Sequence, residues 1–270
     1  MKRLLALGLA AAAGSAAALD EVPFITTPDH VTLAMLRLAE VHARDVVLDL
    51  GSGDGRIPIT AARRFGARGI GVEIVPDLVA KSRENARRAG VADKVRFHEQ
   101  DLFQTDLSVA SVVTMYLLPD VNLQLRPKLL ALAPGTRIVS HDWDLGDWRP
   151  DRTLTLPVPD KAVGKEKSSR LHLWTVPAPL DGLWCGRGVQ VRIEQRFQQV
   201  AARVDGGNDA VTLDGRITGT WVQLAGSGEA TEWRWSAGSP VRLELRRAGP
   251  TLAKWQGQRF VPATGDRCPA

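Results

Sequence analysis

A strand-like apolar run that breaks into a glycine-rich turn is the feature that most limits the fold of this chain. In the segment VVLDLGSGDGR the glycines occupy alternate positions, Gly51, Gly53 and Gly55, and two acids, Asp49 and Asp54, accompany them. A turn of this kind joins a buried strand to a helix and lets the backbone approach a ligand closely. We therefore expect a parallel sheet with a nucleotide-like ligand at its edge.

The segments around this turn alternate between strand-like and helix-like patterns. Such alternation is typical of βαβ units and of a parallel sheet covered by helices on both faces. A helix over residues 27–43 is expected to precede the sheet, with Thr27 as its N-cap and Pro28 in the first helical position. Strands are expected at 46–50, 69–74, 94–99, 111–116 and 136–141, with helices at 57–65, 76–90 and 121–132; segments 152–158 and 170–176 could complete the sheet.

The pattern changes near residue 180. Helical periodicity stops, and short strand-like runs separated by Gly, Asp, Ser and Asn take over. The predicted strands are VQVRIEQRF, DAVTLDG, RITGTWVQL, ATEWRWS, VRLELRR and LAKWQGQRF. This favours a small all-β barrel or sandwich, whose core we expect to be filled by Trp221, Trp233, Trp235 and Trp255. The fold class is therefore α/β, with a Rossmann-like doubly wound sheet in residues 20–178 and an all-β domain in residues 179–270.

Residues 1–19 have the composition of a secretory signal peptide. Lys2 and Arg3 precede an alanine-rich apolar stretch that ends in small residues suited to cleavage. We expect a periplasmic or secreted protein with no stable membrane span once the leader is removed. An uncleaved leader that anchors the chain to a membrane and a cytoplasmic location are the alternatives.

The chain has two cysteines, Cys185 and Cys268. An oxidising compartment could join them in a disulfide, although the sequence does not show whether they lie within bonding distance. Neither has a His or Cys at metal-ligand spacing, so we expect no metal site.

The acids of the glycine turn argue against a ligand that carries phosphate. Dinucleotide-binding turns have the spacing GxGxxG, whereas this turn has GxGxG, and carboxylates close to a phosphate would repel it. S-adenosylmethionine suits the turn better, because it has a sulfonium, an ammonium and an adenosine but no phosphate. Glu73, at the end of the second predicted strand, could bind both ribose hydroxyls, and Asp101, after the third, could accept from the adenine amino group.

Taken together, DLGSGDG, Glu73, Asp101 and the APG turn at 133–135 resemble a class I S-adenosylmethionine-dependent methyltransferase over about residues 23–177. The segments TTP, MLRLA, YLLP and SHD are similar to the lysine methyltransferases that modify the ATP synthase c subunit and the adenine nucleotide translocase, and to their bacterial relatives. The resemblance implies a seven-stranded sheet and S-adenosylmethionine as cofactor. By position it implies cofactor contacts from Asp49, Gly51, Ser52, Gly53, Asp54, Gly55, Glu73, Asp101 and Leu102.

Three residues at the ends of the fourth and fifth predicted strands are candidates for the chemistry. Tyr116 could line a channel for a lysine or pack against the adenosine, and His141 with Asp142 could accept a proton or only shape the pocket. Trp143 and Trp148 are expected to cover the pocket or to lie in the core.

We expect a protein lysine as the methyl acceptor. A small-molecule acceptor is the alternative within the enzyme class, and a secreted protein that only binds S-adenosylmethionine is the alternative outside it. The net charge is +5, but the basic residues are scattered among acids, so no nucleic-acid partner is expected.

Overall fold

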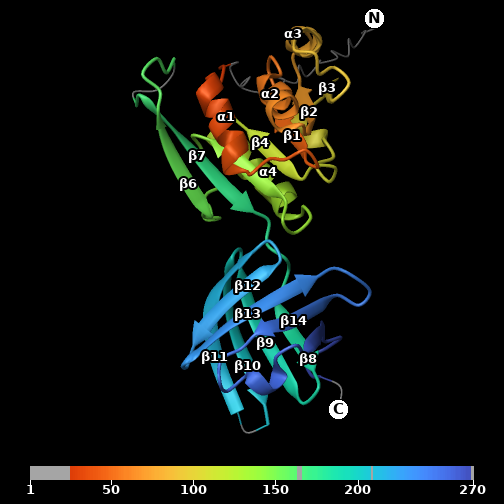
Figure 1. Cartoon of the computed structure of the whole chain (residues 1–270), viewed down its shortest axis with the longest axis vertical. Coiled ribbons are helices and arrows are strands. Elements are labelled where there is room, and N and C mark those ends of the chain that lie inside the picture. Colours follow the sequence, from red (N-terminus) through yellow and green to blue (C-terminus); the bar gives the residue numbers. More distant parts are fainter. Residues whose placement is uncertain (1–24, 163–165, 208, 269–270) are drawn as a thin grey trace, which may run out of the picture.

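The computed structural model describes residues 25–162, 166–207 and 209–268 as two bodies joined end to end (Figure 1). The first body is an α/β sheet domain and the second is an all-β barrel. The predicted leader, residues 1–19, lies outside the described residues. Within those residues, no helix has both the length and the apolar character needed to cross a bilayer.

The first body is a seven-stranded sheet with the order β3-β2-β1-β4-β5-β7-β6. β1 lies near the centre and pairs in parallel with β2 and β4, whereas β7 runs antiparallel to β5 and β6. The strand order reverses between β1 and β4, and ligands of open α/β sheets bind at the carboxyl ends of the strands at such a point. The strands are β1 (Val46–Leu50), β2 (Arg68–Glu73), β3 (Val95–Glu99), β4 (Val112–Met115), β5 (Arg137–His141), β6 (Arg152–Pro157) and β7 (Ser168–Thr175).

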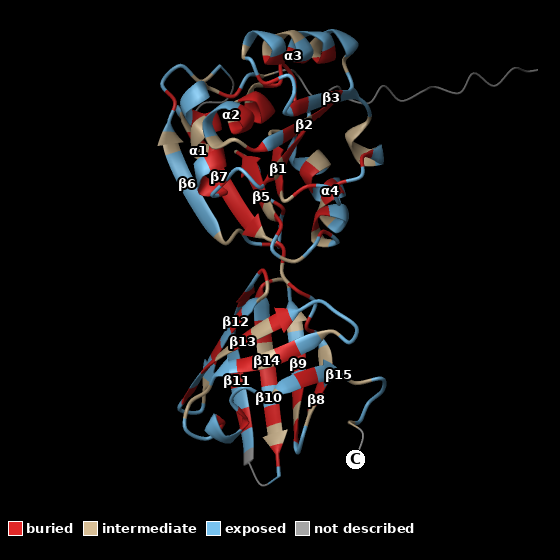
Figure 2. Cartoon of the chain, turned by 45° about the vertical axis from the view of Figure 1, so that its right-hand side comes forward, coloured by how far each residue is buried: buried red, intermediate tan, exposed pale blue. Residues whose placement is uncertain are grey.

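Helices cover both faces of this sheet, because alternate residues of each buried strand point to opposite sides. Val47 of β1 packs with apolar residues of α1 and α2, whereas Leu48 and Leu50 pack with Leu125 and Leu129 of α4. The helices are α1 (Asp29–Leu38), α2 (Arg56–Phe65), α3 (Pro76–Arg88) and α4 (Pro119–Leu130), with a short 3-10 turn, η1 (Leu102–Gln104), after β3. The colouring of Figure 2 shows the buried strands between the helices.

The first helix differs from its prediction. It begins at Asp29 with Pro28 in the capping position, so the assignment of Thr27 as N-cap is wrong. Thr27 is buried, its hydroxyl lies 3.3 Å from His141 Nδ1, and its carbonyl accepts from Arg56. The threonine thus serves tertiary contacts instead of the helix end.

The second body is a closed barrel with the strand order β10-β11-β12-β13-β14-β15-β8-β9. A barrel, and not a sandwich, is therefore the form of the predicted all-β domain. The strands are β8 (Gly182–Gly186), β9 (Val189–Arg196), β10 (Gln199–Gly206), β11 (Asp209–Thr218), β12 (Trp221–Gly226), β13 (Glu229–Ser236), β14 (Arg242–Arg247) and β15 (Arg259–Pro262), with η2 (Ala253–Trp255) before the last.

Two barrel strands, β8 and β10, are absent from the predicted set, and β11 runs unbroken through a predicted boundary. The turn between β9 and β10 is a two-residue hairpin, and Phe197 adopts φ 53° in it. Such a turn usually carries Gly, Asn or Asp, so the sequence gives no signal for it. Phe197 instead stacks on Trp148 of the sheet domain, with ring centroids 6.1 Å apart.

Three of the four tryptophans predicted for the barrel core are buried: Trp233, Trp235 and Trp255. Trp221 is 47% exposed, so its placement in the core is wrong. Its neighbour on the strand, Val222, points inward, and the alternation of the strand therefore places Trp221 outside. The guanidinium of Arg234 lies 4.4 Å from the centroid of the exposed indole.

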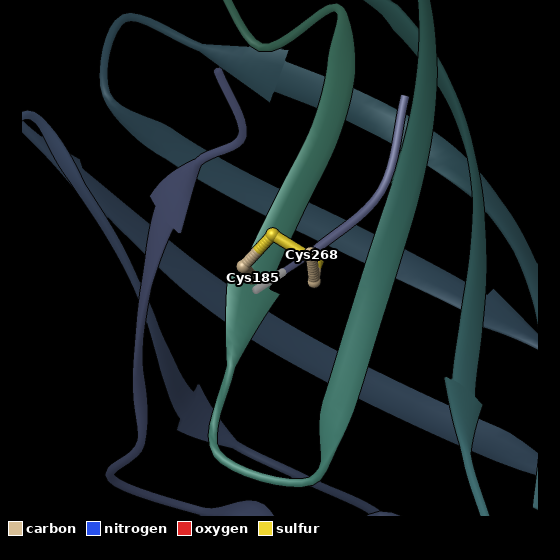
Figure 3. Close-up of a disulfide and its surroundings, with 2 residues drawn as sticks. All are labelled: Cys185 and Cys268. Atoms are coloured by element: carbon tan, nitrogen blue, oxygen red, sulfur yellow. A yellow bond between two sulfur atoms is a disulfide. The ribbon is translucent and has the colours of Figure 1, made fainter. Parts of the chain in front are cut away.

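Cys185 and Cys268 form a disulfide, with their Cα atoms 5.5 Å apart (Figure 3). Cys185 belongs to β8, and Cys268 lies in the segment that follows β15. The bond therefore ties the end of the described chain to the first strand of the barrel.

The barrel packs against the amino ends of the parallel strands. Ala178 N donates to Gly219 O at 2.7 Å, and a Cβ on Gly219 would lie 3.2 Å from Gly135, just before β5. The Arg216 guanidinium lies 2.5 Å from an Asp151 carboxylate oxygen, just before β6. The carboxyl ends of β1, β4 and β5 lie at the opposite edge of the sheet.

Candidate active site

The glycine turn after β1 has the backbone that its sequence requires. Gly51, Gly53 and Gly55 have φ values of 71°, 51° and 79°, a region that side chains disfavour. A Cβ would also lie 2.9 Å from Leu117 at Gly51 and 2.6 Å from Phe97 at Gly55. The turn therefore presents bare backbone at the carboxyl edge of the sheet.

Asp49 lies beneath this turn with 3% of its surface exposed. Its Oδ1 accepts a 2.7 Å hydrogen bond from the Thr114 hydroxyl. Burial, against the effect of the Thr114 hydrogen bond and with smaller contributions from Asp54 and Glu73, raises the pKa of Asp49 to about 8. A cation placed beside Asp49 would favour its charged form, which suits the predicted cofactor contact, since S-adenosylmethionine carries a sulfonium and an ammonium.

Glu73 is fixed by three backbone amides. Its Oε2 accepts from Gly53 N at 2.9 Å, and its Oε1 accepts from Ile74 N at 2.9 Å and Val75 N at 3.0 Å. A carboxylate has about four acceptor positions, so Oε2 of Glu73 can still accept from one ribose hydroxyl. The sequence predicted a ribose ligand at this position but not the bond that ties it to the glycine turn.

The other two predicted acids have partners of their own. Asp54 pairs with Arg56 at 2.7 Å, and this guanidinium lowers the pKa of Asp54 although burial acts to raise it. Asp54 is therefore a neutralised member of the turn, and repulsion of a phosphate falls to Glu73. Asp101 Oδ1 accepts from Phe103 N at 2.8 Å, which caps the 3-10 turn that begins at Leu102.

The donor and acceptor set of this edge fits S-adenosylmethionine. Asp49, Glu73 and Asp101 are acceptors, and the ligand brings an ammonium, two ribose hydroxyls and an adenine amino group as donors. Ser52 Oγ is buried and has no hydrogen-bond partner among the described residues, which leaves a polar atom for a ligand to satisfy. When bound, S-adenosylmethionine supplies a methyl group activated by its sulfonium.

Tyr116, His141 and Asp142, predicted as a catalytic set, lie together. The Tyr116 and His141 rings stack with centroids 3.9 Å apart, and the Tyr116 hydroxyl donates to Asp142 Oδ2 at 3.3 Å. Burial and then Asp142 raise the pKa of Tyr116 to about 12, so its hydroxyl stays protonated. Asp142 has a φ of 65°, in the left-handed region that Asp adopts more readily than most other residues with a side chain.

His141 is buried and neutral. Burial lowers its pKa to about 4, partly opposed by Asp142. Its Nε2 lies 2.8 Å from the Ser169 hydroxyl, and its Nδ1 lies 3.3 Å from the Thr27 hydroxyl. Because both ring nitrogens have partners, the arrangement favours shaping of the pocket over the proton-acceptor role.

Lys161 is a member of this cluster that the sequence did not single out. Its Nζ lies 2.7 Å from Asp142 Oδ2 and donates to the Ser168 carbonyl at 2.6 Å. Although burial acts to raise the pKa of Asp142, Lys161 and His141 lower it. Lys161 belongs to a turn rich in Gly and Lys, and only the pairing of β7 with β5 brings that turn to Asp142.

The two tryptophans that follow β5 have different environments. Trp148 is fully buried against Trp174, with ring centroids 6.1 Å apart, which confirms a core position. Trp143 is 44% exposed beside the cluster, and its backbone carbonyl accepts from Asn122 at 3.2 Å. Trp143 is therefore the member of the pair that remains available to cover the pocket.

Comparisons with known proteins agree with this geometry. The model of the ANTKMT methyltransferase domain matches residues 49–152. A protein-lysine N-methyltransferase of Saccharolobus islandicus is 42% identical over 135 residues, which cover 49% of this chain and 84% of that protein. The mouse lysine N-methyltransferase named for the ATP synthase c subunit is 35% identical over 133 residues, 49% of this chain and 53% of that protein. The chain thus spans about half the length of this mouse relative.

A solved structure agrees as well. The RNA methyltransferase from Salinibacter ruber, in complex with S-adenosyl-L-homocysteine, is 52% identical, with a TM-score of 0.53 over 58% of this chain and 96% of that one. These matches, with the seven-stranded sheet and the acid-lined glycine turn, assign the cofactor and the reaction class. The chain belongs to the class I S-adenosylmethionine-dependent methyltransferases, in the group that contains the ANTKMT methyltransferase domain.

Proposed function

We propose that this methyltransferase transfers the methyl group to the Nζ of lysine side chains in a protein. The observation that carries the proposal is the amine position at the end of β5, where Asp142 and the Ser168 carbonyl hold a lysine Nζ at 2.7 and 2.6 Å. Tyr116 adds a protonated hydroxyl, which donates to the same Asp142 Oδ2 that pairs with this amine. The names of the archaeal and mouse relatives support the same acceptor.

In this proposal the residues of the chain attract and orient the acceptor. Asp142 attracts the lysine as its ammonium, and Tyr116 and His141 form one wall of the site. The lysine must lose a proton to solvent before its lone pair can attack. No side chain of the site has to act as a strong base in this scheme. Proximity and desolvation of the reacting groups therefore supply most of the rate enhancement.

RNA is the second candidate acceptor. It is favoured by one observation, the RNA methyltransferase name of the Salinibacter ruber relative, which shares 52% identity. The sequence predicted no nucleic-acid partner. The proposal of a protein lysine as acceptor agrees with that prediction.

The test uses S-adenosylmethionine labelled in its methyl group and an extract divided into protein, RNA and small-molecule fractions. Label in the protein fraction that acid hydrolysis recovers as methyl-lysine supports the proposal. Label that nuclease releases points to RNA, and label confined to small molecules points to the other enzyme alternative. The variant Asp49→Asn controls for transfer that does not depend on the site.

We also propose that the chain matures in an oxidising compartment, such as the periplasm or the medium. The Cys185–Cys268 disulfide supports this, because such bonds persist where thiols are oxidised. Alkylation of free thiols in freshly lysed cells tests it. Alkylation of both cysteines would show two free thiols and would contradict the proposal. An intact disulfide, with neither cysteine alkylated, would support it.

A further inference from the structure

Lys161 places an amine of the chain itself at the position that we propose for the acceptor. Its side chain is 14% exposed, and its Nζ has two acceptors, Asp142 Oδ2 and the Ser168 carbonyl. The backbone that leads into Lys161 is anchored, since Lys161 N donates to Val158 O at 3.1 Å and Val158 is 3% exposed.

This amine lies on the same edge of the sheet as the glycine turn. Asp142 follows β5, Tyr116 follows β4 and the glycine turn follows β1, and these three strands are direct neighbours in parallel register. The ends of β1 and β5 are two strand spacings apart, roughly 10 Å. The residue after Tyr116 lies between these two strand ends and touches the glycine turn. A Cβ placed on Gly51 would lie 2.9 Å from the Leu117 side chain.

We propose that Lys161 is a substrate of the chain's own active site and is N-methylated in cis. The inference rests on the proposed lysine methyltransferase function and names one acceptor for it. The structure shows the lysine bound by the groups that would bind an amine from another protein.

The reaction balances with S-adenosylmethionine as the only co-reactant. The Lys161 ammonium loses a proton to solvent, and the Nζ lone pair forms a bond to the methyl carbon. The bond between that carbon and sulfur breaks, its electron pair stays on sulfur, and S-adenosylhomocysteine leaves. The methylated amine regains a charge and can still donate to Asp142, so the product keeps the ion pair.

A purely structural ion pair is the competing explanation. In that case Lys161 only fastens the turn to Asp142, an arginine would serve as well, and the lysine would stay unmodified. The variant Lys161→Arg keeps the charge and cannot give methyl-lysine. Lys167→Arg is the matched control, since Lys167 is exposed on the same hairpin and its Nζ donates to the Lys161 carbonyl.

The experiment incubates the purified full-length chain with S-adenosylmethionine that carries a deuterated methyl group, followed by peptide mass spectrometry. We expect deuterated methyl on the peptide with Lys161 in the wild type and in Lys167→Arg, and none at that position in Lys161→Arg. A reaction in cis also requires that the initial fraction labelled per minute does not change when the enzyme is diluted.

The outcomes separate this inference from the proposed function. Transfer to lysines of added proteins with Lys161 unmodified overturns the inference and leaves the function standing. Transfer to no protein overturns both. A labelling rate that falls in proportion to dilution overturns the assignment in cis.

Discussion

Replacing Asp49 by Asn should stabilise the protein while it removes the cofactor site. The folded pKa of Asp49 is about 8 against 3.8 in the unfolded chain, so the folded state binds more protons between these values. Stability therefore falls as the pH rises from about 4 to about 8, by about 1.4 kcal/mol per pH unit, and the cost stays constant above that range. At pH 7 the stability lost in this way amounts to roughly 4 kcal/mol.

Asparagine does not ionise, so the variant does not lose stability in this way as the pH rises. Its oxygen can still accept from the Thr114 hydroxyl, but its amide hydrogens lose about 1–3 kcal/mol if they find no acceptor. The net gain of Asp49→Asn should therefore be about 1–3 kcal/mol at pH 7, and it should vanish or reverse near pH 5.

Urea denaturation at pH 5, 6, 7 and 8, followed by helical circular dichroism, measures this difference. The signal reports the sheet domain, because the four α-helices of the described chain all belong to it. Asp93→Asn, at an exposed carboxylate, is the matched control and should show no such trend. A difference between Asp49→Asn and wild type that is constant from pH 5 to pH 8 would refute the reasoning.

Three further substitutions test other parts of the structure. Gly55→Ala should lose about 2 kcal/mol or more and weaken cofactor binding in calorimetry, because φ is 79° there and Phe97 leaves no room for a Cβ; wild-type behaviour would contradict this. Tyr116→Phe should reduce kcat about tenfold with an unchanged cofactor Kd, since only the bond to Asp142 is lost. Cys268→Ser should lower the free energy of unfolding of the barrel by about 2–4 kcal/mol in urea, because the bond closes a long loop.

The sheet domain could be predicted closely because its signals are local. The glycine turn, the apolar strands and the capping prolines each mark one element, and β1 and α4 lie within two residues of the predicted ends. The three acids of the cofactor edge follow from the same pattern, since each lies at or just beyond the carboxyl end of a parallel strand.

The remaining parts depend on contacts between distant segments. The hairpin between β9 and β10 has no turn residue that the sequence could reveal, and its Phe197 is held by Trp148 of the other domain. Arg56 neutralises Asp54 and Lys161 reaches Asp142, and in both cases the partner is known only once the chain is folded. Charge partners of this kind have no fixed spacing in the sequence. A motif can therefore identify the two acids, but it cannot identify the basic residues that pair with them.

The position of the barrel limits what it can contribute to the reaction. It contacts the sheet through Gly135, Asp151 and Trp148, at or near the amino ends of the parallel strands. Tyr116 and Asp142 lie at the carboxyl ends, so the described barrel residues do not line the position proposed for methyl transfer. In the proposed function the choice of the amine therefore belongs to the sheet domain, and the exposed Trp221 indole with its Arg234 partner takes no part in it.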